Sequence, residues 1–148
     1  MQASESTTYN NTRVDRKLDK EIDDLVGKRF GLLHKIKNGL VGSEPFVIHQ
    51  WQGDFDFDAE SKDYDRKCNI ELRPNGIIVH YRKKLSTFIW PIPFHQLTIY
   101  KSGEAISIYQ NTNFIKMKPM LRRKKLSPFI QKVITAKTEY MSSHHLLW

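Results

Sequence analysis

The sequence NIELRPNGIIVHYR, residues 69–82, decides the expected fold. Two runs rich in Ile, Val and Tyr flank Pro74-Asn75-Gly76, and such runs around an Asn-Gly step are typical of a β-hairpin. The Asn-Gly step is expected to supply the positive φ angles of a tight turn. We therefore predict an antiparallel hairpin over residues 70–82.

Further short strands are expected on both sides of this hairpin. Residues 46–51 alternate in polarity and are rich in Val, Ile, Phe and Trp, which favours a strand. After the hairpin, four apolar runs each end at a proline or a turn sequence: residues 86–90, 96–100, 105–109 and 114–117. With the two hairpin arms this makes seven strands. Short strands at such spacing are typical of an antiparallel meander that closes into a barrel or folds into a sandwich.

An amphipathic helix is expected near the N-terminus. Apolar side chains recur there at helical spacing, on one face: Val14, Leu18, Ile22, Leu25 and Val26. The pattern continues weakly past Gly27, so the helical segment is expected to end at Asn38-Gly39. Residues 1–12 are polar without periodicity, and we expect a flexible tail there.

A second amphipathic helix is expected at the C-terminal end. Ser127-Pro128 places a capping hydroxyl beside a proline at the first helical position. The apolar side chains that follow share one face: Phe129, Ile130, Val133 and Ile134. We predict that this face is buried against the sheet or covers a barrel mouth.

Three stretches carry a likeness to a known family: IELRPNGIIVHYRKK (70–84), FIWPIPFHQLTIYKSG (88–103) and AISIYQNTNFIKM (105–117). Seven short strands followed by one C-terminal helix is also the element order of that family. On these residues the chain resembles the bacterial pleckstrin-homology-like (PH-like) domains, over about residues 44–142.

The resemblance implies a mainly β (α+β) fold: a PH-like seven-stranded antiparallel barrel or roll with a C-terminal capping helix. One PH-like domain then spans residues 13–148, after the tail at 1–12. The helical segment 14–38 is an N-terminal addition to the PH pattern, and residues 54–65 are an insertion between the first two strands. No single catalytic or ligand signature defines the family.

Length and composition describe one domain with its own core. The 148 residues are 39% hydrophobic and 27% charged. No apolar run approaches the roughly 18 residues that cross a bilayer, the N-terminus lacks the apolar stretch of a secretory signal, and Cys68 is the single cysteine. We expect a cytoplasmic protein, including a peripheral location at the membrane surface.

Charge is distributed unevenly along the chain. Residues 1–66 carry 10 basic and 13 acidic residues, net −3, and residues 67–148 carry 14 and 3, net +11. Residues 54–65 form an acidic stretch that contains Asp54, Asp56 and Asp58. Six cations form a basic strip: Lys116, Lys118, Arg122, Arg123, Lys124 and Lys125. Charge runs of this kind are usually solvated faces, and the acidic and basic stretches can also attract each other within the fold; the functional alternative is a site for an external anionic partner.

Catalytic and metal signatures are missing from the sequence. The six histidines do not have metal-ligand spacing, and the calcium-like DFDFDAESKDYD has Ala59 where a glycine is needed. Cys68 lacks a neighbouring pattern that would stabilise a thiolate, so we expect a core residue. We expect no enzyme activity, no cofactor and no metal site, with Asp54, Asp56 and Asp58 exposed to solvent.

Binding is the remaining class of function. Apolar residues interleave with the cations of the basic strip, which suits a protein partner or an anionic lipid headgroup. PH domains that bind phosphoinositides use basic early loops, and here those positions are acidic or neutral, so that lipid function is not implied. Nucleic acid is the alternative partner, placed second because residues 116–125 contain no aromatic side chain.

Two further expectations concern packing. Trp51, Trp90 and Tyr100 occupy strand positions and are expected to belong to the core rather than to a ligand platform. The N-terminal helix packs either on its own domain or on a second copy of the chain, which leaves a homo-oligomer as an alternative to a monomer.

Overall fold

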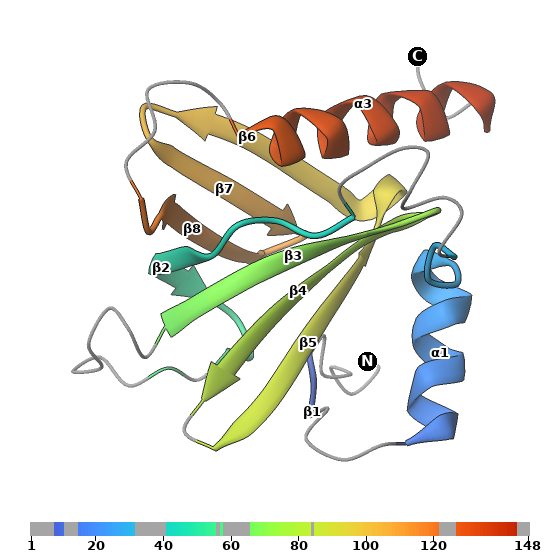
Figure 1. Cartoon of the computed structure of the whole chain (residues 1–148), viewed down its shortest axis with the longest axis horizontal. Coiled ribbons are helices and arrows are strands. Elements are labelled where there is room, and N and C mark those ends of the chain that lie inside the picture. The colour runs from blue at the N-terminus through green and yellow to red at the C-terminus, as the bar shows by residue number, and fades with distance from the viewer. Residues whose placement is uncertain are drawn as a thin grey trace.

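Eight strands and two α-helices make up the described part of the chain (Figure 1). The computed structural model describes residues 8–10, 15–31, 41–55, 57, 66–83, 85–121 and 127–144. The helices are α1 (Arg16–Val26) and α3 (Pro128–Ser143), and η2 (Phe94–Gln96) is a short 3₁₀ turn. The strands are β1 (Tyr9–Asn10), β2 (Phe46–Gln52), β3 (Lys67–Arg73), β4 (Gly76–Lys83), β5 (Ser86–Pro93), β6 (Leu97–Ser102), β7 (Ala105–Gln110) and β8 (Asn113–Pro119).

The strands form one antiparallel sheet in the order β1-β5-β4-β3-β2-β8-β7-β6. Two meanders, β2 to β5 and β6 to β8, are joined where the first strand of one pairs with the last strand of the other, β2 with β8. The mainly β fold with one helix at each end is therefore confirmed. The sheet is open, however, with β1 and β6 at its two edges, so closure into a barrel is not found.

Two prolines restrict further pairing along the end of β5. Pro91 and Pro93 lack the backbone N–H that a further strand would need. The residues before them, Phe88 and Ile89, pair with Asn10 and Tyr9 of β1. The expected tail at residues 1–12 thus contains one paired stretch, and it covers part of the β5 edge.

The hairpin over residues 70–82 is confirmed, but the expected reason for it is wrong. The strands β3 and β4 pair from Cys68 with Tyr81 to Arg73 with Gly76, so Pro74 and Asn75 are the turn residues. Neither Asn75 nor Gly76 has a positive φ. Gly76 is needed instead for close packing, because a Cβ there would lie 2.3 Å from the Ile92 carbonyl oxygen and 2.8 Å from Val26 Cγ1.

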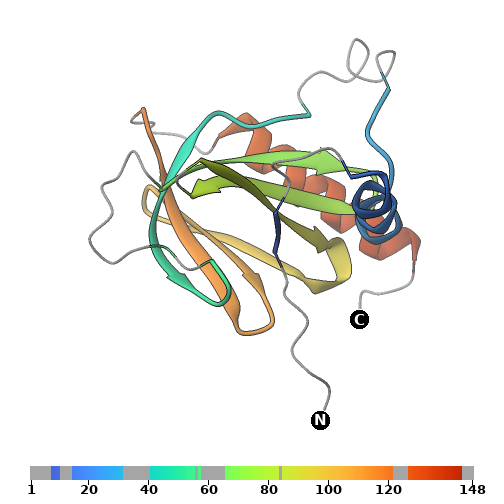
Figure 2. The same cartoon turned by 90° about the horizontal axis from the view of Figure 1, so that it is seen from below.

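The core lies inside the curved sheet and is covered by α3 (Figures 1 and 2). Its largest buried side chains include Phe46, Trp90 and Phe94 of the sheet and η2. The expected apolar face of α3 is confirmed, with Phe129, Ile130 and Val133 buried and Ile134 half-buried: the prediction holds for three of the four fully.

The start of α3 differs in detail from the expectation. Pro128 is the first helical residue, as expected. The Ser127 hydroxyl does not cap the helix and instead donates a hydrogen bond to Glu44 Oε2 at 3.0 Å. This bond ties the start of the helix to the residues that lead into β2.

The helix α1 lies on the outer face of the sheet, over β4 and β5. Ile22 and Val26 form a second apolar cluster with Ile78 and Ile89. Leu18, Ile22 and Val26 of the predicted apolar face are therefore used within the same chain, whereas Leu25 is 40% exposed and Val14 lies outside the described residues. The helix ends at Gly27, whose φ of 87° interrupts the helical path, so residues 27–31 do not continue it to Asn38 as expected; residues 32–40 lie outside the described part.

Replacing Gly76 tests the packing of the hairpin against α1. We expect Gly76→Ala to lower the free energy of unfolding by about 1–3 kcal/mol, because the backbone oxygen of Ile92 cannot move aside for the new methyl group. Gly31→Ala is the matched control, since a Cβ there meets nothing within 4 Å. Urea unfolding of both variants provides the measurement, and equal losses would show that the close approach at Gly76 is absent.

Candidate functional site

One face of the sheet gathers aromatic and cationic side chains. In β7 and β8, Ile108 pairs with Ile115 on the core side, so the flanking pairs Tyr109–Phe114 and Ser107–Lys116 lie on the opposite, outer side. Tyr100 of β6 pairs with Ser107 on that side. We call five residues of this side the lysine–aromatic face: Tyr100, Tyr109, Phe114, Lys116 and Lys118.

The three rings of this face form a row across β6, β7 and β8. The ring centroids of Tyr100 and Tyr109 lie 5.7 Å apart with planes 14° from parallel, and those of Tyr109 and Phe114 lie 5.1 Å apart at 30°. Tyr100 is 45% exposed, and the other two rings are half-buried. A hydrogen bond of 3.1 Å from the Tyr100 hydroxyl to that of Tyr109 raises the pKa of Tyr109. Tyr100 was expected in the core and is instead part of an exposed aromatic row.

The charge of the face is positive. Its lysines form no ion pair with any described residue: Lys118 is exposed and Lys116 is half-buried. The four strands that carry or flank the face, β2, β6, β7 and β8, contain no Asp or Glu. Glu104 in the β6–β7 turn is an exposed acidic residue between two of these strands. The cations are therefore not neutralised within their own strands.

The residues of the predicted basic strip divide into two groups. Lys116 and Lys118 lie on the lysine–aromatic face. Four members lie outside the described residues: Arg122, Arg123, Lys124 and Lys125. Met117, which lies between Lys116 and Lys118 in the sequence, is buried in the core, whereas Met120 and Leu121 are exposed after β8.

Sequence reasoning missed Tyr109 and Phe114 as site residues. The alternation of side chains along a strand could have identified them. Ile106, Ile108 and Ile115 are buried on the core side, so the residues next to them lie on the outer side. The pairing of Tyr109 with Phe114 then depends on the register of β7 against β8, which a single strand does not reveal.

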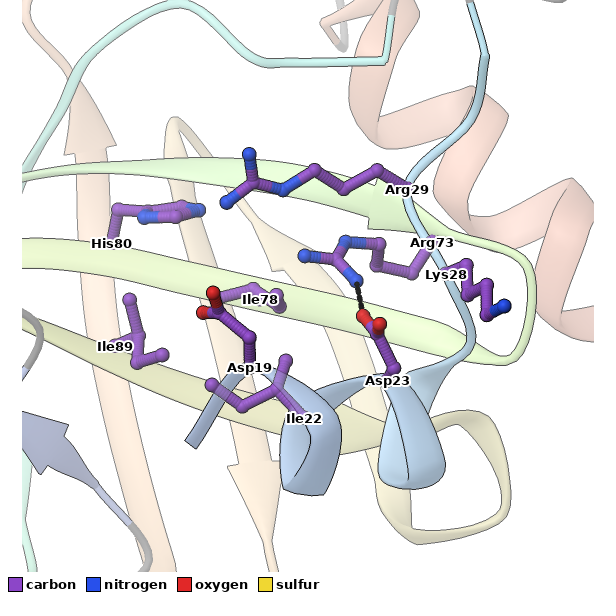
Figure 3. A pocket seen from close by; sticks show the side chains of 9 residues that line it. All are labelled: Asp19, Ile22, Asp23, Lys28, Arg29, Arg73, Ile78, His80 and Ile89. Carbon is purple, nitrogen blue, oxygen red and sulfur yellow. Dashed lines mark hydrogen bonds and ion pairs between the residues drawn. The ribbon is translucent and has the colours of Figure 1, made fainter. Parts of the chain in front are cut away.

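A second cluster lies between α1 and the outer side of β3 and β4, in a cavity of about 330 Å³ (Figure 3). Arg73 is at its centre and is only 3% exposed. Its Nη1 donates to Asp23 Oδ1 at 3.1 Å and to the Gly27 carbonyl oxygen at 2.7 Å, and its Nε donates to Glu71. The other Glu71 oxygen lies 2.8 Å from His80 Nε2. These bonds tie the end of α1 to the sheet.

The carboxyl of Glu71 is strongly influenced by these partners. Burial alone would raise its pKa, but hydrogen bonds from His80 and Arg73 and the positive charge of Arg73 outweigh burial and lower the pKa to about 2. Arg73 has three partners within the chain, so we assign the cluster a role in holding α1 in place.

The remaining residues singled out in the sequence belong to neither of these two groups. Among the described residues, no three His, Cys, Asp or Glu side chains are grouped as metal ligands. Cys68 is buried in β3, as expected, and burial raises its pKa to about 12. Asp54 is exposed as expected, while Asp56 and Asp58 lie outside the described part. Trp90 is fully buried and donates its Nε1–H to Gln110 at 2.8 Å; Trp51 is half-buried, with the Arg66 guanidinium 5.5 Å from its ring centre.

Comparison with known proteins adds no relative. No family model, curated protein or solved structure matches this chain. Neither α1 nor α3, the helices among the described residues, has the length and apolar content to span a bilayer.

The interactions of Glu71 predict that the free energy of unfolding falls as the pH becomes acidic. A carboxyl whose pKa is lower in the folded state stabilises the protein above the unfolded pKa of about 4.5, and this contribution is lost as the pH falls toward about 2. The linked change is about 3 kcal/mol at most. We expect Glu71→Gln to lower the unfolding free energy at pH 6 and to flatten its decline between pH 5 and pH 2.

Urea unfolding at several pH values provides this measurement. Glu139→Gln, which changes an exposed carboxyl on α3, is the matched control and is expected to keep the wild-type decline. Equal declines for the wild type and the Glu71 variant would contradict the assigned pKa shift.

Proposed function

We propose that this chain is a non-enzymatic binding module that holds an anionic partner through the basic strip and the lysine–aromatic face. The observation that carries the proposal is the pair Lys116 and Lys118, which have no ion-pair partner among described residues, on a face whose four strands contain no carboxylate. Cations gathered without internal counter-charges repel one another, and an anionic partner relieves that repulsion.

We also propose that the module is PH-like in organisation. Three features support this: meanders of four and three strands, their junction through β2 and β8, and a C-terminal helix that supplies core residues. The gap between β5 and β6 is bridged by η2, and α3 packs on η2 and hydrogen-bonds β6 through Lys137 and the Leu97 carbonyl oxygen. The scaffold then serves to present a rigid outer face.

The candidate partners have one chemical feature in common, anionic oxygen atoms. Carboxylates of an acidic protein segment and phosphates of a lipid headgroup, the partners expected first, both provide it. The reason for placing nucleic acid second was the lack of aromatic residues within 116–125. That reason is weakened, because Phe114 and Tyr109 occupy the same side of the sheet as Lys116.

Neutralising the end of the basic strip tests the proposal. In the variant with Arg122, Arg123, Lys124 and Lys125 all replaced by Gln, we expect binding to phosphatidylserine vesicles to weaken by about 1 kcal/mol per charge, with little change in melting temperature. The matched control replaces Arg16, Lys17, Lys20 and Lys28, four exposed cations on α1 and the segment after it, and loses the same charge. Cosedimentation and thermal melts at low salt provide the measurements.

The outcomes separate two partners of the strip. Weaker binding with unchanged stability supports an external anionic partner. Lower stability with unchanged binding would show that the acidic stretch 54–65 is the partner, and no binding of the wild-type protein to vesicles, acidic peptides or oligonucleotides would contradict the proposed function.

A further inference from the structure

We infer that the lysine–aromatic face binds single-stranded nucleic acid, with bases stacked on the rings of Tyr109, Phe114 and Tyr100 and phosphates held by Lys116 and Lys118. This inference rests on the proposed function and names the class of anionic partner. It depends on three properties of the face: a row of accessible rings, cations interleaved with them, and polar side chains beside them.

The ring row provides the stacking surface. Tyr100 and Tyr109 are stacked with centroids 5.7 Å apart, and Phe114 lies 5.1 Å from Tyr109 at a tilt of 30°, so the three rings form one row across neighbouring strands rather than one isolated ring. Every nucleobase has a π-face, and open sheet faces with exposed aromatic side chains bind single strands by stacking successive bases. In a duplex the bases already stack on one another, so this surface favours a single strand.

The cations occur at the spacing of the strand. Phe114, Lys116 and Lys118 alternate along β8 and share its outer side, because Ile115 and Met117 between them are buried. Side chains two residues apart on a strand are separated by about 7 Å, which is within reach of a lysine side chain. A phosphate next to a base stacked on Phe114 therefore lies close to Lys116, and Lys118 extends the positive charge in the same direction.

Polar side chains extend the face on β2. Gln52 pairs with Phe114 and Gln50 pairs with Lys116, and both glutamines are exposed. Gln52 Nε2 already donates to the Thr112 carbonyl oxygen at 3.0 Å, so Gln50 is the amide that offers both a donor and an acceptor to the edge of an unpaired base. Neither of the described helices occupies the site: α1 packs over β4 and β5, and the buried residues of α3 belong to the core.

A lipid headgroup makes different demands on the same face. It would use the lysines, with the exposed Met120 and Leu121 available to contact acyl chains, but it gains nothing from a row of stacked rings. The rings therefore distinguish the two partners, and removing them is the sharpest test.

The experiment measures binding of the full chain to fluorescein-labelled dT12 and rU12 by fluorescence anisotropy over a range of salt concentrations. The comparison probes are a duplex of the same length and phosphatidylserine vesicles. We expect the wild-type protein to bind both single strands more tightly than the duplex.

Ring and charge variants are expected to act differently. Tyr109→Leu and Phe114→Leu keep apolar volume but remove the ring, and each is expected to weaken single-strand binding about tenfold without changing its salt dependence. Tyr109→Phe, the matched control, keeps the ring and is expected to retain binding. The double variant Lys116→Gln/Lys118→Gln is expected to lower the slope of log K against log salt by about 0.7 per lysine.

Two controls test whether the effects come from charge loss elsewhere or from unfolding. Lys17→Gln/Lys20→Gln removes the same charge from α1 and is expected to leave the salt slope unchanged. Thermal melts identify any ring variant that is less folded, and in that case Tyr100→Leu, at the β6 edge of the sheet, gives the ring test instead.

The outcomes distinguish this inference from the proposed function. Single-strand binding that survives the loss of the rings would overturn the stacking inference. Binding to vesicles without binding to single strands would overturn it too and leave the proposed function standing. Failure to bind any anionic probe would contradict both.

Discussion

The pairing register of β7 with β8 is the constraint on which the candidate site depends. Ile108 faces Ile115 and Ile106 faces Met117 on the core side, and all four are buried. Because successive side chains of a strand point to opposite faces, this buried set forces Tyr109, Phe114 and Lys116 to the outside. A slip of one residue would bury the lysine and expose the isoleucines, so the core itself enforces the composition of the outer face.

The two halves of the sheet differ in what covers their outer faces. Over β4 and β5 the outer face is apolar at Ile78 and Ile89, and α1 covers it. The buried Arg73 joins the end of that helix to the sheet through Asp23 and Gly27. Over β6, β7 and β8 the outer face carries rings and lysines and is not covered by either described helix. One half of the sheet therefore has its outer face engaged by α1, and the other half is left uncovered by the two described helices.

Local signals in the sequence predicted most of the elements. The hairpin around Asn75, the strand at 46–51 and the start of α3 at Pro128 all follow from propensity and turn chemistry that act over a few residues. The reason given for the hairpin turn was wrong, because the need for glycine at position 76 comes from Ile92 and Val26, which are distant in sequence. Likewise, the Ser127 hydroxyl hydrogen-bonds Glu44, a residue distant in sequence, rather than capping its own helix.

The open sheet and the aromatic row could not be predicted in this way. The open sheet depends on pairings between strands far apart in sequence, β2 with β8 and β1 with β5, and the aromatic row depends on the registers of β6 with β7 and of β7 with β8; local propensity encodes neither. The basic strip was visible as a charge run, but only the register places Lys116 on the same side as Tyr109 and Phe114. The change in the expected partner follows from that placement alone.

Amide NMR titration of the isotopically labelled chain with dT12 tests the central claim most directly, because it reports where the anionic strand binds. The account predicts shifts concentrated in Tyr100, Tyr109, Phe114, Lys116 and Lys118 and their neighbours on β2, with α1 unchanged. Shifts concentrated on α1 and the cavity around Arg73, or shifts absent from β6, β7 and β8 at saturation, would contradict it.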